Sequence, residues 1–490
     1  MKLASPQATT WLDRSAHALV LVLASALIAS PEALAEETRM GHQKTAWQSQ
    51  EFAQHAGKAM TFGNAYRRFL GRHKTEREVV GAALDMAKKR GHRDLLAKKP
   101  PKVRKGSKLY AQRHGKALAL IVVGEKPISE GVHVVAAHID SVRIDLKQKP
   151  LYADGNAAWL QTQYYGGIKG YNWLSMPLEL RGVVIRKDGT AVEIAIGDSP
   201  DEPVLVIPDV ATHVAYRVDR KEGEEVPGER LDPILSSTPA KNAPAGRDPF
   251  AAQAEKLLQE QYKVQLADLA AAELELVPAG VPRDVGIDRA LIGGYGHDDR
   301  ACSYAAVRAL LDIGAPQHTA IVMLVDREET GSHGNTGAQS NFIRQIVAEL
   351  IEGTGGTSTE VAVDRALAAS MVMSADVTGA VNAQYPEIYD PKNAAFLGAG
   401  VVWDRSALHA EVMSYVRTLF DQKGIAHQPA MWAKASRYSS GGTVLPYFTK
   451  HGMNGLDVSI PVLSMHAPFE VLSKADLYEG YRAYRAFLAD

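Results

Sequence analysis

Gly131-Val-His-Val-Val-Ala-Ala-His-Ile-Asp-Ser-Val-Arg143 is the stretch that most clearly predicts the fold of this chain. Residues 132–137 form an apolar, largely β-branched run, long enough for a buried strand and too short for a helix. His138 ends the run and Asp140 follows it. Ligands of open α/β sheets gather beyond the carboxyl ends of the strands, where a histidine can bind a metal while a carboxylate orients its ring. Because an isolated His-x-Asp is more often a core histidine beside an exposed acid, the rest of the chain must decide.

Three later apolar runs also lead directly into candidate ligands: residues 319–325 into Glu328 and Glu329, residues 369–374 into Asp376, and residues 455–463 into His466. Asp298 and Asp299 open an alanine-rich helix expected to reach Leu311, where acids could also serve only the helix dipole. Placing so many charged side chains together at the ends of strands is costly, because they repel one another and lose water, unless a counter-charge is present. Two histidines and three carboxylates suit a pair of borderline metals such as zinc. A remaining carboxylate can act as a base toward water.

The 490 residues, 46% apolar and 23% charged, indicate a globular protein with more than one domain. Residues 36–149 and 285–490 show the strand–helix alternation of an α/β domain. Residues 150–284 are rich in Tyr, Gly, Pro and short β-type runs. The sequence therefore predicts a catalytic α/β domain, with a central sheet flanked by helices, that is interrupted by a β-rich insert. Thr75 and Glu78 form a capping-box pattern within a helical stretch from Phe62 to Gly91.

Residues 1–35 have the pattern of an export signal. Lys2 and Arg14 precede a weakly polar-to-apolar run over residues 16–29, and Ala33-Leu-Ala35 supplies small residues for cleavage. The run is shorter than a membrane span, so the mature protein is expected to be periplasmic or secreted and free of the membrane. A net charge of −1 gives no reason to expect nucleic acid or a membrane surface as a partner. Cys302 is the single cysteine, which excludes an intrachain disulfide.

Several motifs together give the chain a resemblance to the aspartyl aminopeptidase / aminopeptidase I family of dinuclear zinc peptidases, in its bacterial branch. They occur in the family's order over residues 62–490: Lys74-Thr-Glu-Arg-Glu, His138-Ile-Asp-Ser, Leu146 to Tyr152, Tyr164-Tyr-Gly-Gly-Ile-Lys, Tyr295-Gly-His-Asp-Asp-Arg, Glu328-Glu-Thr-Gly-Ser, Ser374-Ala-Asp-Val and Leu463-Ser-Met-His-Ala-Pro-Phe-Glu. So many motifs in order are far more specific than any one of them.

The resemblance implies a zinc-exopeptidase fold, two zinc ions per chain, peptide substrates and a homo-oligomer, commonly a tetrahedral dodecamer assembled through the insert. It also implies a role for each site residue. His138 and Glu329 bind opposite sides of the metal pair, Asp376 and His466 complete the two sides, and Asp298 bridges them, with Asp299 as the second choice. Glu328 matches the general base, and Asp140 matches the residue that orients His138. Tyr164 to Gly167 would reach a neighbouring subunit's site, although the sequence alone equally allows a plain aromatic turn.

The segment 403–443 departs from the family pattern. A Lys/Gly/Ser-rich loop is shortened after Gly398-Ala-Gly-Val-Val, and Arg437 stands in a segment where relatives carry an acid. The preferred N-terminal residue and the native metal therefore stay open. Two alternatives to an aminopeptidase follow: a dinuclear hydrolase that removes a different terminal group, and a zinc-binding paralogue without turnover that serves as a scaffold or binding protein. The intact Glu328 argues against the paralogue, and the altered segment argues for it.

Overall fold

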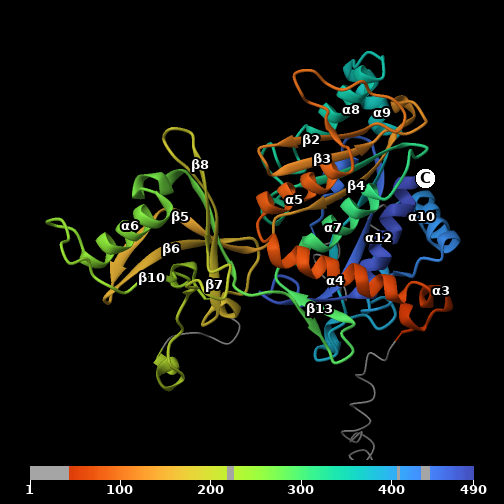
Figure 1. Cartoon of the computed structure of the whole chain (residues 1–490). Helices are drawn as coiled ribbons and strands as arrows, with labels where there is room; N and C mark the ends of the chain where they lie inside the picture. The colour runs from red at the N-terminus through yellow and green to blue at the C-terminus, as the bar shows by residue number, and fades with distance from the viewer. Residues whose placement is uncertain (1–42, 218–225, 405–408, 432–441) are drawn as a thin grey trace, which may run out of the picture.

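The computed structural model describes residues 43–217, 226–404, 409–431 and 442–490. Figure 1 shows two bodies side by side: a larger one in which helices cover a sheet, and a smaller one built mainly of strands. The export signal predicted over residues 1–35 lies outside the described residues. Within these ranges, no helix combines the length and the apolar character needed to cross a membrane.

The larger body is organised by one sheet, which has 13 strands in the described part of the chain. In spatial order its main path is β1 (Arg93–Asp94), β2 (Lys108–Arg113), β3 (Ala117–Val122), β14 (Thr319–Val325), β4 (Val132–His138), β15 (Met371–Ser374), β19 (Asn454–Leu463), β20 (Glu470–Ser473), β13 (Leu291–Gly294) and β12 (Arg283–Val285). Off this path lie β16 (Val377–Gly379), β17 (Val401–Trp403) and β18 (His427–Pro429). The neighbours β14, β4, β15 and β19 run parallel to one another. Their carboxyl ends therefore meet at one edge of the sheet.

Helices cover both faces of this sheet, which explains why every residue of β4 and β14 is buried, without alternation. Val135 and Ala137 belong to the core on one face, while Val134 and Ala136 belong to the core on the other. The first core includes α4 (Ala56–Arg72), α5 (Glu76–Lys89), α7 (His297–Leu311), α10 (Ala410–Lys423) and α12 (Lys474–Ala489). The second includes α8 (Phe342–Gly353), α9 (Glu360–Ala368) and α11 (Leu445–Thr449). The expected α/β class, with a central sheet flanked by helices, is confirmed.

The smaller body is a β-rich unit with its own core. Its strands in spatial order are β11 (Ala272–Pro278), β5 (Arg143–Asp154), β6 (Ala157–Tyr165), β10 (Ile234–Ser236), β9 (Leu205–Val206), β7 (Pro177–Ile185) and β8 (Ala191–Ile196). Because β11 also pairs with β7, these strands close into a ring with β8 attached to β7, and closure leaves fewer open edges. Trp173 is fully buried in its core, and α6 (Pro249–Tyr262) contacts β5, β6 and β10. We call this unit the insert.

The helical stretch expected over residues 62–91 consists of two helices, α4 and α5. Helix α5 begins at Glu76 because Thr75 caps it, and both hydrogen bonds of the predicted capping box with Glu78 are present. The remaining short elements are α3 (Gln50–Ala53) and the 3₁₀ turns at Ala46–Gln48, Ile128–Glu130, Gly170–Trp173, Thr212–Arg217, Gly228–Arg230, Leu266–Ala271, Glu328–Thr330 and Pro386–Ile388.

Candidate metal centre

The carboxyl edge of the parallel strands brings the predicted ligands together. His138 is the last residue of β4, and Glu329 lies in the 3₁₀ turn Glu328–Thr330 after β14. Asp376 follows β15, His466 follows β19, and Asp298 lies in the first turn of α7. Four of these residues meet because the parallel strands that they follow or end are neighbours in the sheet, and helix α7 brings Asp298 to the same edge.

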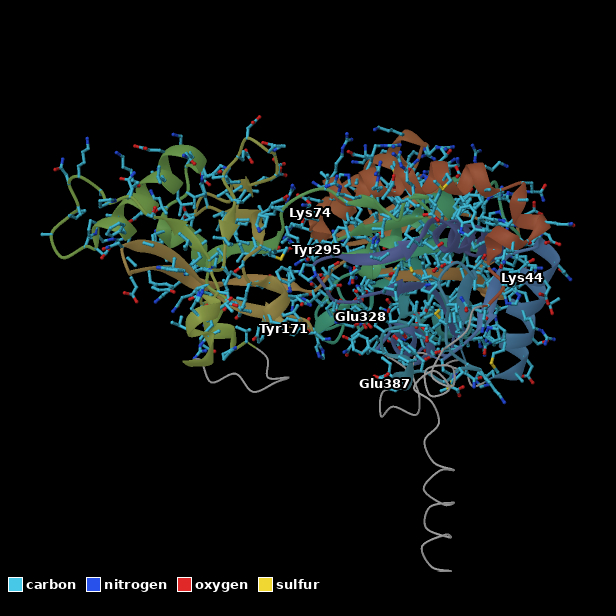
Figure 2. All side chains as sticks on the ribbon, turned by 90° about the horizontal axis from the view of Figure 1, so that it is seen from below. Lys44, Lys74, Tyr171, Tyr295, Glu328 and Glu387 are labelled. Atoms are coloured by element: carbon cyan, nitrogen blue, oxygen red, sulfur yellow. The ribbon has the colours of Figure 1, made fainter. Side chains whose placement is uncertain are left out.

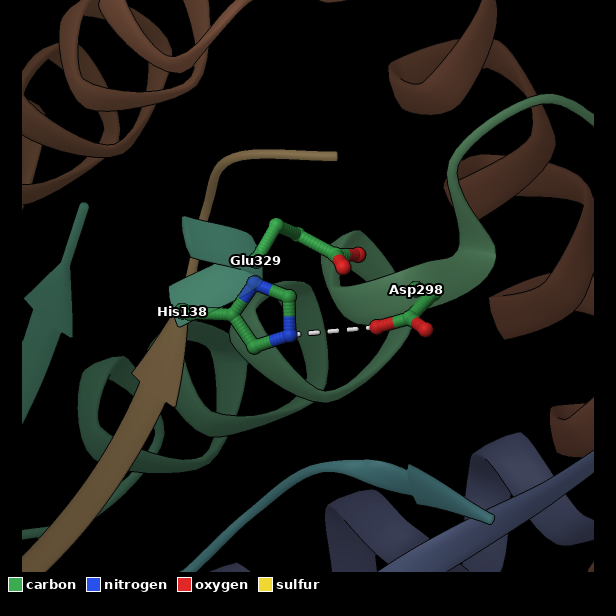
Figure 3. A group of neighbouring side chains, drawn as sticks. All are labelled: His138, Asp298 and Glu329. Atoms are coloured by element: carbon green, nitrogen blue, oxygen red, sulfur yellow. Dashed lines mark ion pairs between the residues drawn. The ribbon is translucent and has the colours of Figure 1, made fainter. Parts of the chain in front are cut away.

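Asp298 lies between the two histidines. Its Oδ1 is 3.1 Å from His138 Nε2, and its Oδ2 is 3.2 Å from His466 Nε2. Figure 3 shows His138 facing Asp298, with the Glu329 carboxylate beside them. Each histidine also has a carboxylate of its own, because Asp376 Oδ1 lies 3.5 Å from His138 Nε2 and Glu329 Oε2 lies 3.4 Å from His466 Nε2. The cluster therefore has two halves that share one carboxylate.

Asp299, the second choice for the shared carboxylate, lies on one side of the cluster only. Ligand atoms of His138, Asp299 and Asp376 lie within 4.8 Å of one another, as do those of His138, Asp298 and Glu329. Asp299 is completely buried, and neither of its carboxylate oxygens has a hydrogen-bond partner in the described part of the structure. Of the two aspartates, Asp298 is the one that contacts both histidines.

The cluster contains more carboxylates than histidines, and the pKa values of some of these carboxylates are raised. Burial, with Asp298 nearby, raises the pKa of Glu329 well above its usual range, and burial with Asp376 nearby does the same for Asp299. Glu329 Oε1 is buried without a hydrogen-bond partner among the described residues. A bound cation would relieve this repulsion. Imidazole nitrogens and carboxylate oxygens form a donor set that fits zinc.

Asp140 connects His138 to the loop that carries the two glutamates. His138 Nδ1 lies 3.0 Å from the Asp140 carbonyl oxygen and 3.3 Å from its Oδ1. The Asp140 carboxylate also accepts hydrogen bonds from the backbone amides of Glu328 (3.1 Å) and Glu329 (3.2 Å). Burial opposes ionisation of Asp140, but the bonds from His138 and Tyr165 hold its pKa below the usual value. With Nδ1 held in this way, His138 presents Nε2 to the cluster.

Glu328 lines the same cavity without belonging to either half of the cluster. The cavity has a volume of about 400 Å³. Besides the ligands, its wall includes the apolar Val377, Val402, Ala430 and Met465, the polar Thr378, Asp404, Thr443, Asp457 and Ser459, and the glycines Gly167 and Gly442. Burial raises the pKa of Glu328 to about 8, with His138 opposing the rise and Asp376 and Asp298 adding to it. A half-buried carboxylate that faces the cavity beside the ligands is suited to accept a proton there.

Two partners of the cluster were not assigned from the sequence. The Glu470 carboxylate accepts the backbone amides of Asp298 (3.2 Å) and His466 (2.8 Å), so it joins the two loops that carry these ligands. The carbonyl oxygen of Gly167, two residues after the insert strand β6, lies 2.9 Å from His466 Nδ1. The only signal for Glu470 in the sequence is that it ends the quoted motif that contains His466. The contact made by Gly167 has no signal in the sequence, because it is made by the backbone.

Part of the segment 403–443, including Arg437, lies outside the described residues. Trp403 ends β17, and Gly442 and Thr443 line the cavity where the description resumes. The expected change in the substrate-facing wall therefore remains a prediction.

Known proteins resemble this chain over almost its whole described length. The sequence matches the family described as aminopeptidase I zinc metalloprotease (M18) over residues 69–488. A probable M18 family aminopeptidase 1 from Borrelia garinii subsp. bavariensis is 39% identical over 440 residues, which are 87% of this chain and 95% of the relative. The crystal structure of an M18 family aminopeptidase from Thermotoga maritima has a TM-score of 0.85 at 36% identity, and covers 91% of this chain and 99% of its own. The S. cerevisiae mApe1 dodecamer shares the fold at 21% identity, with a TM-score of 0.71, covering 88% of this chain and 97% of its own.

Proposed function

Because this chain belongs to the M18 family of aminopeptidase I zinc metalloproteases, it is a zinc metallo-aminopeptidase, and we propose that it removes the N-terminal residue of peptides at a pair of zinc ions. The observation that carries the pair is the position of Asp298, whose two oxygens face different histidines at 3.1 and 3.2 Å. A carboxylate that faces two imidazoles is better placed to bridge two cations than to bind a single cation.

Each half of the cluster would hold one zinc ion. His138 and Asp376 form one half, His466 and Glu329 form the other, and Asp298 belongs to both. This grouping keeps the expected ligand set, with His138 and Glu329 on opposite sides. Bound zinc would supply Lewis-acid polarisation of the scissile carbonyl and would lower the pKa of a water molecule. Glu328 takes the proton of the attacking water and passes it to the leaving amine, while Asp140 keeps His138 and the glutamate loop in position.

The test measures metal content and substrate class together. Protein purified in zinc buffer should contain two zinc ions per chain by elemental mass spectrometry. It should release free amino acids from a mixed peptide pool, but not from the same pool after N-terminal acetylation. One zinc per chain would contradict the pair. Equal release from the acetylated pool would instead support a hydrolase of another terminal group, and bound zinc without turnover would support a scaffold.

Self-association through the insert is part of the proposal. The mApe1 relative is described as a dodecamer, and the insert of this chain exposes several large apolar side chains: Tyr171, Ile185, Val204, Val210 and Val214. Apolar side chains that a monomer would leave in water are suited to contacts between copies. Light scattering should show a closed homo-oligomer at micromolar concentration, and a monomer at that concentration would contradict this.

Export is also proposed, from the pattern in residues 1–35. Protein isolated from its native host should begin at Glu36, as determined by N-terminal sequencing or intact mass. Full-length protein in the cytoplasm would contradict this.

A further inference from the structure

Tyr165 ends strand β6, and together with the following Gly166 and Gly167 it brings the insert into contact with the metal centre of its own chain. We call these three residues the strap. In Figure 2, Glu328 lies on the part of the larger body that faces the insert, and Lys74 and Tyr295 lie at the junction. The strap touches the surroundings of both histidines, one through a side chain and one through a backbone carbonyl.

On the His138 side, the contact runs through Tyr165. Its hydroxyl donates a 2.8 Å hydrogen bond to Oδ2 of Asp140. The same carboxylate oxygen accepts the amide of Glu329, and the other oxygen faces His138 Nδ1. Tyr165 is 9% exposed and Asp140 is fully buried, so water cannot readily replace the hydroxyl. Removing it would leave the buried carboxylate with one donor fewer.

On the His466 side, the contact is made by the glycines. Gly167 places its carbonyl oxygen 2.9 Å from His466 Nδ1, which turns Nε2 toward Asp298. Gly166 has a φ of +73°, and a Cβ built there would lie 2.7 Å from Val142 Cγ1 and 3.2 Å from Glu329 Cβ. The strap therefore passes directly over a ligand, and only glycine fits at its centre.

The strap is anchored by a buried ionic cluster at the junction. Arg143 is the cross-strand partner of Tyr165, and its guanidinium lies 3.7 Å from the centre of the Tyr165 ring. Arg143 is in turn held by three carboxylates on three elements: Asp145 at 2.8 Å, Glu275 at 3.3 Å and Glu76 at 3.5 Å. Glu76 belongs to the Lys74-Thr-Glu-Arg-Glu motif, so this motif fastens the larger body to the strap.

We propose that the strap is a positioning element for the zinc ligands, so that the insert forms part of the catalytic centre of its own chain. This inference rests on the proposed zinc pair. Partners that hold the second nitrogen of a metal-bound histidine typically change metal affinity or activity 10–100-fold when they are lost. Gly167 supplies such support to His466 directly, and Tyr165 supports His138 through Asp140.

The test compares two strap variants with two matched controls in the full-length protein. Tyr165→Phe removes the hydroxyl that reaches Asp140, and Gly166→Ala introduces the clash with Val142 and Glu329. Tyr152→Phe removes a similar bond, 3.0 Å to Asp232, elsewhere in the insert. Gly155→Ala introduces a side chain at a similar φ of +58° with no atom within 4 Å. The two controls thus make the same substitutions, Tyr→Phe and Gly→Ala, at positions outside the strap.

Zinc affinity is measured by competition with a chromophoric chelator, and the melting temperature is measured with and without zinc. Both strap variants should bind zinc about 10–100-fold more weakly than wild type. Their zinc-dependent gain in melting temperature should be smaller, and kcat should fall more than KM rises. The controls should stay within about twofold of wild type. Strap variants that match wild type, or controls that lose as much affinity, would overturn the inference. A wild type with one zinc ion would overturn the pair alone, because the comparison among variants would still decide the role of the strap.

Discussion

The Oδ1 atom of Asp140 lies 3.1 Å from the backbone nitrogen of Glu328. Since the same carboxylate also contacts His138 and the amide of Glu329, one buried side chain fixes a ligand and the proposed base relative to each other. A substitution that changes the size of a side chain here would move the base and the ligands together. A substitution that keeps the size and changes only the chemistry tests each role separately.

Glu328→Gln makes such a change at the base. The variant should keep two zinc ions per chain, because Glu328 belongs to neither half of the cluster, and it should lose turnover. Loss of a general base costs about 10²–10⁴-fold. Elemental mass spectrometry and kcat measurements check both points, with Glu329→Gln as the contrasting variant that loses metal. If Glu328→Gln lost metal instead, the roles of the two glutamates would have to be exchanged.

Asp298→Asn and Asp299→Asn distinguish the two candidates for the shared carboxylate. Asp298 contacts both histidines, so its amide variant should bind fewer than two zinc ions per chain. Asp299 lies near His138 and Asp376 only, so its amide variant should retain more zinc than Asp298→Asn. Zinc titration of the two purified variants provides the comparison. The reverse order of zinc loss would make Asp299 the bridge.

Lys74→Met and Arg77→Met test the junction motif by comparing a buried ion pair with an exposed one. Lys74 is 4% exposed, and its Nζ lies 2.7 Å from the buried Glu179. Without the ammonium, Glu179 loses the partner of its Oε1 while Arg181 still pairs with its Oε2, so the free energy of unfolding should fall by about 1.5–3 kcal/mol. Arg77 pairs with Glu273 at the surface, and its loss should cost at most about 1 kcal/mol. Urea unfolding measures both, and equal costs would contradict the structural role of Lys74.

His133 should make the protein less stable in acid. Burial lowers its pKa to about 4, against a hydrogen bond to the Phe487 carbonyl that opposes the shift. The unfolded chain, with a histidine pKa of about 6.5, binds more protons between these values, so the free energy of unfolding falls as the pH falls through this window. At pH 5 the loss should be about 2 kcal/mol.

His133→Phe keeps a ring between His318 and Phe487, which stack on His133, and should reduce the loss of stability between pH 7 and pH 5. The exposed His409, changed to Phe, serves as the control and should leave the pH dependence unchanged. An unaltered slope for His133→Phe would show that other groups cause the acid sensitivity.

The sequence by itself determined the local elements and the kinds of ligand. Strand β14 has the limits expected from its apolar run, β4 extends the expected run by one residue to His138, and Thr75 caps α5 as the capping box predicts. Such features follow from the burial and hydrogen bonding of residues that are close in the chain. Only the tertiary structure decided that Asp298 faces both His138 and His466, that Glu470 joins two ligand loops, and that Gly167 of the insert reaches His466. These contacts depend on which strands become neighbours in the sheet, and the periodicity of a single strand carries no information about its neighbours.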